Sequence, residues 1–175
     1  GTNTTQKVIG SVQHLEYSIS DGINKISKGK QKKVAIIKGN GELQERHIAK
    51  FLMQVRESYF IGPFTLDSVA KNPEGTLKSL QNYDLAVIAK PTEAFTDEEK
   101  LVLDQFIIHG GKTLWLIDQV NAEMDSLYND AGATLAYPFD LNLNDLFFKY
   151  GVRINPTIIK DVMAAPIGLA TGEQG

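Results

Sequence analysis

The sequence predicts an α/β fold. We expect a doubly wound, mainly parallel sheet of the flavodoxin-like or Rossmann-like kind, with an additional helix at its N-terminus. Three apolar runs, residues 33–38, 84–89 and 112–117, each end in a small polar cluster. Short continuous apolar runs are typical of parallel strands that are buried on both faces. Helically patterned stretches separate them, as in successive β-α-β units.

Composition sets limits on the class of protein. The chain has 175 residues, of which 42% are hydrophobic, a net charge of −3 and no cysteine. The apolar content suffices for a core, and the mild negative charge argues against a nucleic-acid binder. Without cysteine, disulfides, thiolate metal sites and a cysteine nucleophile are excluded.

We expect an amphipathic helix and linker at 1–30, an α/β domain at 31–165, and at 166–175 the tail of a longer protein.

An apolar stripe over residues 5–28 predicts the N-terminal helix. Its members recur every three or four residues and are Val8, Val12, Leu15, Ile19, Ile23 and Ile26. We expect this helix to pack on the sheet or to form part of a longer arm. Because the spacing is close to a heptad, an interface with a second copy or a partner is the alternative.

The other elements follow in order along the chain. We predict strand 33–38, helix 42–57, strand 61–66, helix 74–81, strand 84–89, a helix that starts after Thr96, strand 112–117, an irregular loop at 119–141, a helix capped by Asn142 or Asn144, and a strand near 152–160. Thr96 and Glu99 have the spacing of a capping box, and Gly110-Gly111 is a typical helix end.

The candidate ligand-binding residues follow the predicted strands. They are Gly39, Asn40, Gly41 and Glu42 after the first strand, Lys90 after strand 84–89, and Asp118 and Asn121 after strand 112–117. Because the carboxyl ends of parallel strands share one edge, where such folds bind ligands, we expect these residues to lie close together. Asp118 can bind a ligand hydroxyl or a cation, or it can cap the turn that follows.

No complete catalytic or cofactor motif accompanies these residues. Gly39 and Gly41 begin a dinucleotide-binding pattern, but Gln44 stands where the third glycine should allow close helix–sheet packing. The three histidines lack a metal-ligand spacing, and there is no nucleophile elbow, HExxH or P-loop. The sequence therefore predicts no catalytic residue, no metal and no cofactor.

Several stretches together resemble one bacterial family. They are Leu15-Glu16-Tyr17, residues 33–43, 86–92, 104–107 and 110–118, the block 140–156, and Ala165-Pro166-Ile167. The block 140–156, which ends in Gly151-Val152-Arg153-Ile154-Asn155-Pro156, is the most specific. The chain resembles the gliding-motility-associated auxiliary component of an ABC transporter, the GldG type.

The resemblance implies a protein that is anchored in the inner membrane by segments outside this sequence, with its soluble part on the periplasmic side. It implies an ABC permease and its ATPase as partners, and a flavodoxin-like or glutamine-amidotransferase-like sheet. An amidotransferase needs a cysteine nucleophile, which is absent here. Asn40 stands where the family tends to carry a histidine, so no role is carried over for that residue.

Three hypotheses for function remain open. The first is a non-catalytic auxiliary domain of an ABC transporter that binds a saccharide, another small ligand or a protein. The second is a hydrolase or a nucleotide- or saccharide-binding enzyme that uses Asp118, Glu42 and the loop 119–141, which predicts a deep pocket with a perturbed carboxylate. The third is a scaffold that makes protein contacts through helix 5–28, as a homo-oligomer or with partners, and through Gly151–Pro156.

Overall fold

The computed structural model describes residues 2–29, 32–123, 133–159, 161 and 163. Its centre is a parallel four-stranded sheet of β1 (Lys33–Lys38), β2 (Phe60–Thr65), β3 (Leu85–Ala89) and β4 (Lys112–Leu116), in the order β2-β1-β3-β4. The order reverses between β1 and β3, as in flavodoxin-like sheets. The predicted doubly wound α/β class is therefore confirmed.

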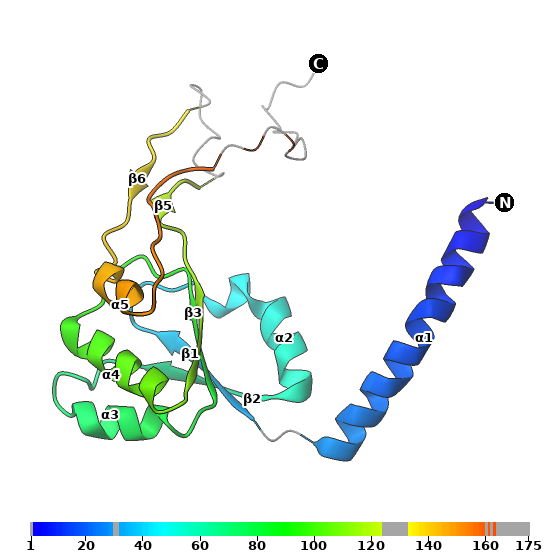
Figure 1. The fold of residues 1–175 in the computed structure, drawn as a ribbon, viewed down its shortest axis with the longest axis horizontal. Helices are drawn as coiled ribbons and strands as arrows, with labels where there is room; N and C mark the ends of the chain where they lie inside the picture. The colour runs from blue at the N-terminus through cyan, green and yellow to red at the C-terminus, as the bar shows by residue number, and fades with distance from the viewer. Residues whose placement is uncertain (1, 30–31, 124–132, 160, 162, 164–175) are drawn as a thin grey trace.

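Helices cover both faces of this sheet (Figure 1). One face carries the short η1 (Glu45–His47) and α2 (Ala49–Ser58), and the other carries α3 (Pro73–Leu80), α4 (Asp97–Ile108) and α5 (Asn144–Lys149). The N-terminal helix α1 (Thr2–Lys28) extends away from the sheet. The larger core accordingly forms on the side of the three helices.

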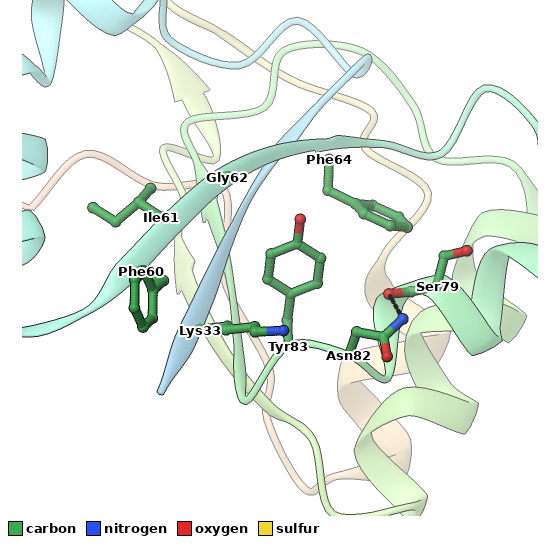
Figure 2. A pocket seen from close by; sticks show the side chains of 8 residues that line it. All are labelled: Lys33, Phe60, Ile61, Gly62, Phe64, Ser79, Asn82 and Tyr83. Carbon is green, nitrogen blue, oxygen red and sulfur yellow. Dashed lines mark hydrogen bonds between the residues drawn. The ribbon is translucent and has the colours of Figure 1, made fainter. Parts of the chain in front are cut away.

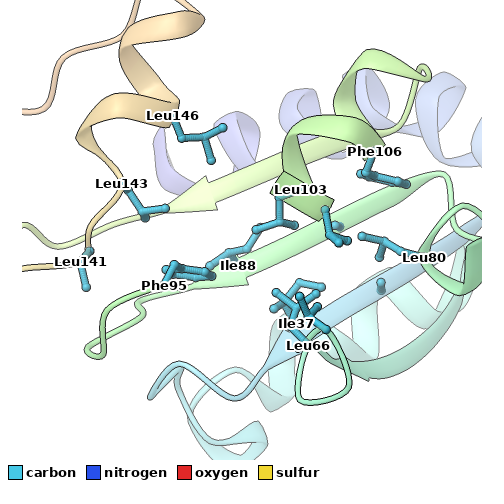
Figure 3. Close-up of a cluster of buried hydrophobic side chains, with 14 of the residues drawn as sticks. Ile37, Leu66, Leu80, Ile88, Phe95, Leu103, Phe106, Leu141, Leu143 and Leu146 are labelled. Carbon is cyan, nitrogen blue, oxygen red and sulfur yellow. The ribbon is translucent and has the colours of Figure 1, made fainter. Parts of the chain in front are cut away.

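Alternation along the buried strands divides the core between the two faces. Ala35 and Ile37 of β1 pack toward α3 and α4 with Leu80, Leu103 and Phe106, part of the larger cluster in Figure 3. Val34 and Ile36 point the other way and meet Leu52 of α2 in a smaller cluster. A strand that is buried on both faces needs apolar residues at every position, and this is why β1 reads as a continuous apolar run.

Aromatic side chains join α5 to the sheet. The Trp115 ring of β4 makes edge-on contacts with Phe95, at 5.9 Å between ring centroids, and with Phe147 of α5, at 5.1 Å. Edge-on geometry is favourable because the positive ring edge meets the negative ring face. The predicted capping box is also confirmed, since the Thr96 hydroxyl accepts from the Glu99 amide and the Glu99 carboxylate accepts from the Thr96 amide.

The structure corrects four predictions about individual elements. The helix predicted over 42–57 begins later, because residues 42–44 run without helical turns before η1 and α2. Neither Asn142 nor Asn144 caps α5. Its N-cap is Leu143, while Asn142 takes a φ of 53° and donates its side-chain amide to the Phe95 carbonyl.

The other two corrections concern the C-terminal part. Residues 152–159 form no strand, since Pro156 lacks an amide donor and the Thr157 amide donates to the Asn155 carbonyl in a local turn. The segment 119–141 contains two short paired strands, β5 (Val120–Asn121) and β6 (Tyr137–Pro138), and its residues 124–132 lie outside the described part. The predicted tail 166–175 also lies outside it.

The apolar stripe of α1 is exposed where its side chains are described. Val12, Leu15, Ile19, Ile23 and Ile26 are between 54% and 87% exposed. Packing of α1 on the sheet, one of the two arrangements expected for this helix, is therefore not observed. The arm-like arrangement is observed, and the stripe faces solvent.

Candidate functional site

The loops after β1 and β3 meet at the point where the strand order reverses. The Thr92 and Glu93 amides both donate to the Asn40 carbonyl at 3.0 Å, and the Thr92 hydroxyl donates to the Gly41 carbonyl at 3.0 Å. The Leu43 amide donates to the Ala89 carbonyl at 3.0 Å. These four bonds fix the two loops against each other at the edge where doubly wound sheets bind ligands.

Glycine is required at Gly41 for two reasons. Its φ is +71°, a left-handed conformation that side chains with a Cβ disfavour. A Cβ there would also collide with the Thr92 hydroxyl. The predicted Gly-Asn-Gly turn is thus a close contact between two loops and does not start a helix in the manner of a dinucleotide fingerprint.

Asn40 lies below this contact and is only 4% exposed. Its side-chain amide donates to Glu99 Oε2 at 3.1 Å, the same oxygen that accepts from the Thr96 amide. Its Oδ1 has no hydrogen-bond partner among the described residues. The start of α4 therefore holds the β1 loop in place through a single carboxylate.

Glu42 is the partly buried carboxylate of the site. Its Oε2 accepts from the Asn40 amide at 2.9 Å, whereas its Oε1 is shielded from solvent and has no hydrogen-bond partner in the described structure. Burial raises the pKa of Glu42, against the lowering effect of backbone hydrogen bonds and of the nearby Lys38 charge. Lys38 itself donates to the Leu43 carbonyl at 2.5 Å.

Lys90 follows β3 with a φ of 52°, an uncommon value for a residue with a Cβ. Its ammonium group forms ion pairs with Glu123 and with Asp118, the latter at 3.4 Å. The pKa of Lys90 is raised, first by the hydrogen bond to Glu123 and then by the two negative charges. The loop after β3 is thereby connected to the segment that follows β4.

These groups surround a cavity of about 640 Å³. It is lined by Gly41, Glu42, Leu43, Gln44, His47, Lys90, Thr92 and Glu123. Of the predicted residues, Gly41, Glu42 and Lys90 lie in its wall and Asp118 contacts Lys90. The predicted gathering of residues from separate strands at one edge therefore holds for these four, although no bound ligand tests their role.

The remaining predicted residues have other positions. Asn40 is buried behind the wall, and Gly39 has a φ of 127° beside Asp67. Asn121 belongs to β5 and donates to the Tyr137 hydroxyl of β6 at 2.5 Å. It thus stabilises the small ladder and does not line the cavity.

Five lining residues were not among the predicted site residues: Leu43, Gln44, His47, Thr92 and Glu123. His47 was expected in mid-helix but lies in η1, where its Nε2 accepts from Arg46 Nε at 3.2 Å. Glu123 lies in the segment interpreted as irregular loop, and Thr92 follows Lys90 in the β3 loop. The polar run Lys90-Pro91-Thr92 was a usable signal for Thr92, whereas Glu123 depends on a contact 33 residues away.

A second hollow, of about 530 Å³, lies at the opposite end of the strands (Figure 2). Its lining includes Phe60, Ile61, Phe64 and Tyr83, with Lys33 at the start of β1. Asn82 donates to the Ser79 carbonyl there at 3.2 Å. This hollow contains none of the predicted site residues. Within the described residues, no cluster of three metal-ligating side chains occurs and no helix is long and apolar enough to cross a membrane.

Comparison with known proteins identifies the family. An uncharacterized protein of Borreliella burgdorferi is 25% identical over 162 residues, which cover 93% of this chain and 30% of that protein. The solved mmIFT52 N-terminal domain matches 67% of this chain and 43% of its own at 20% identity, with a TM-score of 0.48. The model of the family described as an ABC-type uncharacterized transport system matches residues 31–175. The chain therefore belongs to this family of auxiliary components of ABC-type transport systems.

Proposed function

We propose that this chain is a non-catalytic binding domain of the auxiliary component, and that it binds a small polar ligand at the cavity between the β1 and β3 loops. The observation that carries the proposal is the convergence of Glu42, Lys90 and Thr92 on one cavity at the switch point of the sheet. The Thr92 hydroxyl donates to the Gly41 carbonyl. It is therefore not paired with a base as a nucleophile would be.

The wider setting is part of the same proposal. We place the domain on the periplasmic side of the inner membrane, anchored by segments outside this sequence, with an ABC permease and its ATPase as partners. The resemblance to the GldG type supports a role in gliding motility or a related transport process. A saccharide is one ligand class with enough hydroxyl groups for such a polar wall, and α1 offers an interface to a partner or a second copy.

Co-purification from the native membrane tests the transporter role. The full-length protein would carry an affinity tag, and the permease and ATPase would be sought in the eluate after mild cross-linking. Matched variants would alter α1 (Leu15→Ser with Ile19→Ser) or the cavity (Lys90→Gln). We expect both transporter subunits in the eluate and a loss on removal of the α/β domain. Absence of both subunits would contradict the proposal.

Protease treatment of intact and osmotically opened cells tests the proposed location. A domain on the periplasmic side is degraded as soon as the outer barrier is opened, while a cytoplasmic control protein remains intact. Protection of the domain until the inner membrane is also lysed would place it on the other side.

One observation favours the enzyme alternative. A partly buried carboxylate with a raised pKa, here Glu42, is what a hydrolase at this edge requires. Assays with activated esters, glycosides and nucleotides would decide between the two. Turnover that disappears in both Glu42→Gln and Asp118→Asn would replace the binding role by a catalytic one.

A further inference from the structure

We propose that the cavity binds its ligand through a positively charged ammonium group that donates hydrogen bonds to Glu42. This inference rests on the proposed ligand-binding function and specifies its chemistry. The proposal is based on which polar groups of the cavity wall already have hydrogen-bond partners and which have none.

Glu42 has an open position for a hydrogen-bond donor. The backbone amide of Asn40 occupies its Oε2, and Oε1 has no partner within the described protein. A shielded carboxylate oxygen without a donor costs about 1–3 kcal/mol or more, because it has lost its hydration. A ligand N–H placed against Oε1 removes this cost. Oε1 is shielded from solvent in this arrangement, so a ligand reaches it when the Glu42 side chain, which lines the cavity, turns toward the bound group.

Lys90 is not available for a negatively charged ligand. Its ammonium group is paired with Glu123 and with Asp118, so the three groups together carry one net negative charge. An anion would have to displace a carboxylate from Lys90 and would then lie beside Glu42. A cation meets attraction from Glu42, whose charge Lys38 offsets in part, and from the surplus negative charge of the Lys90 group.

The Thr92 side chain also favours a ligand that donates. Its hydroxyl uses its hydrogen on the Gly41 carbonyl, so its oxygen is left to accept. His47 does not add to this preference, because its Nε2 already accepts from Arg46 and its ring proton is then on Nδ1, a donor. The Oδ1 of Asn40 also has no partner among the described residues, but it is buried behind the wall. An ammonium group has several N–H donors and can therefore bond to both the Glu42 carboxylate and the Thr92 oxygen.

Nuclear magnetic resonance titration with three small probes tests the charge class. Methylammonium, methanol and acetate are similar in size, but the first is a cation, the second a neutral donor and acceptor, and the third an anion. Each would be added to the isotope-labelled chain at constant ionic strength and pH 7.5. We expect methylammonium to cause saturable shifts of the amide signals of residues 41–44, and acetate to cause none there.

Matched variants locate the effect. Glu42→Gln keeps the size of the side chain and removes its charge, and we expect it to weaken methylammonium binding at least tenfold. Glu45→Gln removes an exposed carboxylate three residues away that does not line the cavity, and its titration should equal that of the wild type. Because a proton competes with the ligand for Glu42, the wild-type affinity should also fall as the pH is lowered toward 5.

Each contrary outcome has a distinct meaning. Equal shifts by methanol, stronger shifts by acetate, or an unchanged titration in Glu42→Gln would overturn the ammonium assignment while leaving a binding site at the cavity. No shift near residues 41–44 with any probe would also overturn it. The transporter role is judged separately, by the co-purification of the permease and ATPase, so failure of one proposal is not mistaken for failure of the other.

Discussion

Asn40 and Glu99 are 59 residues apart in sequence and form one polar unit in the fold. A single Glu99 oxygen accepts from both the Thr96 amide and the Asn40 side chain. The capping box of α4 is thus also a support for the loop that borders the cavity. Buried polar networks of this kind fix one arrangement only while each member has its partner.

Glu99→Ala is expected to disturb the cavity although Glu99 does not line it. The substitution removes the acceptor for the nearly buried Asn40 amide and one half of the capping box, with a cost of about 1–3 kcal/mol. Glu99→Gln keeps an acceptor oxygen and should cost less. Urea unfolding of both variants, followed by circular dichroism, measures the difference. Equal stability of Glu99→Ala and wild type would refute the role of this carboxylate.

Glu42 should make the free energy of unfolding depend on pH in an unusual direction for a carboxylate. Its pKa is raised in the folded state, so between the ordinary value of 4.5 and the raised value the folded chain binds more protons than the unfolded chain. The contribution of Glu42 to stability therefore decreases as the pH rises through this window. Glu42→Gln removes this decrease and should be slightly stabilising at pH 7, by less than about 1 kcal/mol.

The measurement is the difference in unfolding free energy between Glu42→Gln and wild type at a series of pH values from 4 to 7. The difference should grow with pH and then level off. A difference that is constant over this range, or that shrinks as the pH rises, would contradict the burial effect assigned to Glu42.

At the scale of elements, the docking of α5 depends on polar contacts with α4. The Lys100 ammonium group contacts Asp97 at 2.9 Å and Asp145 at 2.8 Å, and the Tyr150 hydroxyl donates to Asp104 Oδ1 at 2.8 Å. Partial burial and this bond to Asp104 raise the pKa of Tyr150 to about 12. Leu146 and Phe147 of α5 also enter the larger core.

Tyr150→Phe tests this docking. It removes the donor to a largely buried carboxylate and leaves the ring in place, so we expect a loss of about 1–2 kcal/mol in the free energy of unfolding. Tyr137→Phe removes a hydroxyl from the exposed β5–β6 ladder and provides the control, with a change of about 0.5 kcal/mol or less. Thermal unfolding by calorimetry compares the two. A larger loss in the Tyr137 variant would reverse the assignment.

The elements that the sequence predicted well are those determined by local pattern. The apolar runs of β1 and β3, the capping box at Thr96 and the glycine end of α4 each have their cause within a few residues. Two of the errors occur where a contact with a residue far along the chain determines the structure: Leu43 is held by Ala89 instead of joining a helix, and Asn142 is held by Phe95 instead of capping α5. The missing strand after residue 152 has a local cause, since the chain turns at Pro156.

For the candidate site, too, the features set by local sequence and fold class were predicted, and those set by contacts between distant loops were not. Fold class alone placed Gly41, Glu42 and Lys90 at a shared edge, because that edge is a property of parallel sheets. The sequence did not show that Lys90 is neutralised by Glu123 or that Glu42 is shielded, since both depend on how the loops fold over one another. The charge preference of the cavity was therefore accessible only from the structure.

At the scale of the whole molecule, the chain consists of an α/β body and the separate helix α1 (Figure 1). The stripe of α1 is exposed, so α1 gains little from the body and the body gains little from α1. An exposed apolar stripe of this length is a feature of interaction surfaces. This supports the proposal that α1 contacts a partner or a second copy.

Removal of residues 1–28 should leave the free energy of unfolding of the α/β body unchanged, within about 0.5 kcal/mol. The same deletion should reduce any self-association seen in sedimentation velocity or any binding to transporter subunits. A strong destabilisation of the body would show that α1 packs against it in solution.

The position of Trp115 gives this protein a built-in optical reporter. The chain has one tryptophan, and its ring contacts Phe95, just before α4, and Phe147 of α5. Its fluorescence therefore senses whether α5 is seated on the sheet, while circular dichroism senses the backbone as a whole. Undocking of α5 would change the emission before the ellipticity, so the C-terminal part can be followed through ligand or partner binding without attaching a dye.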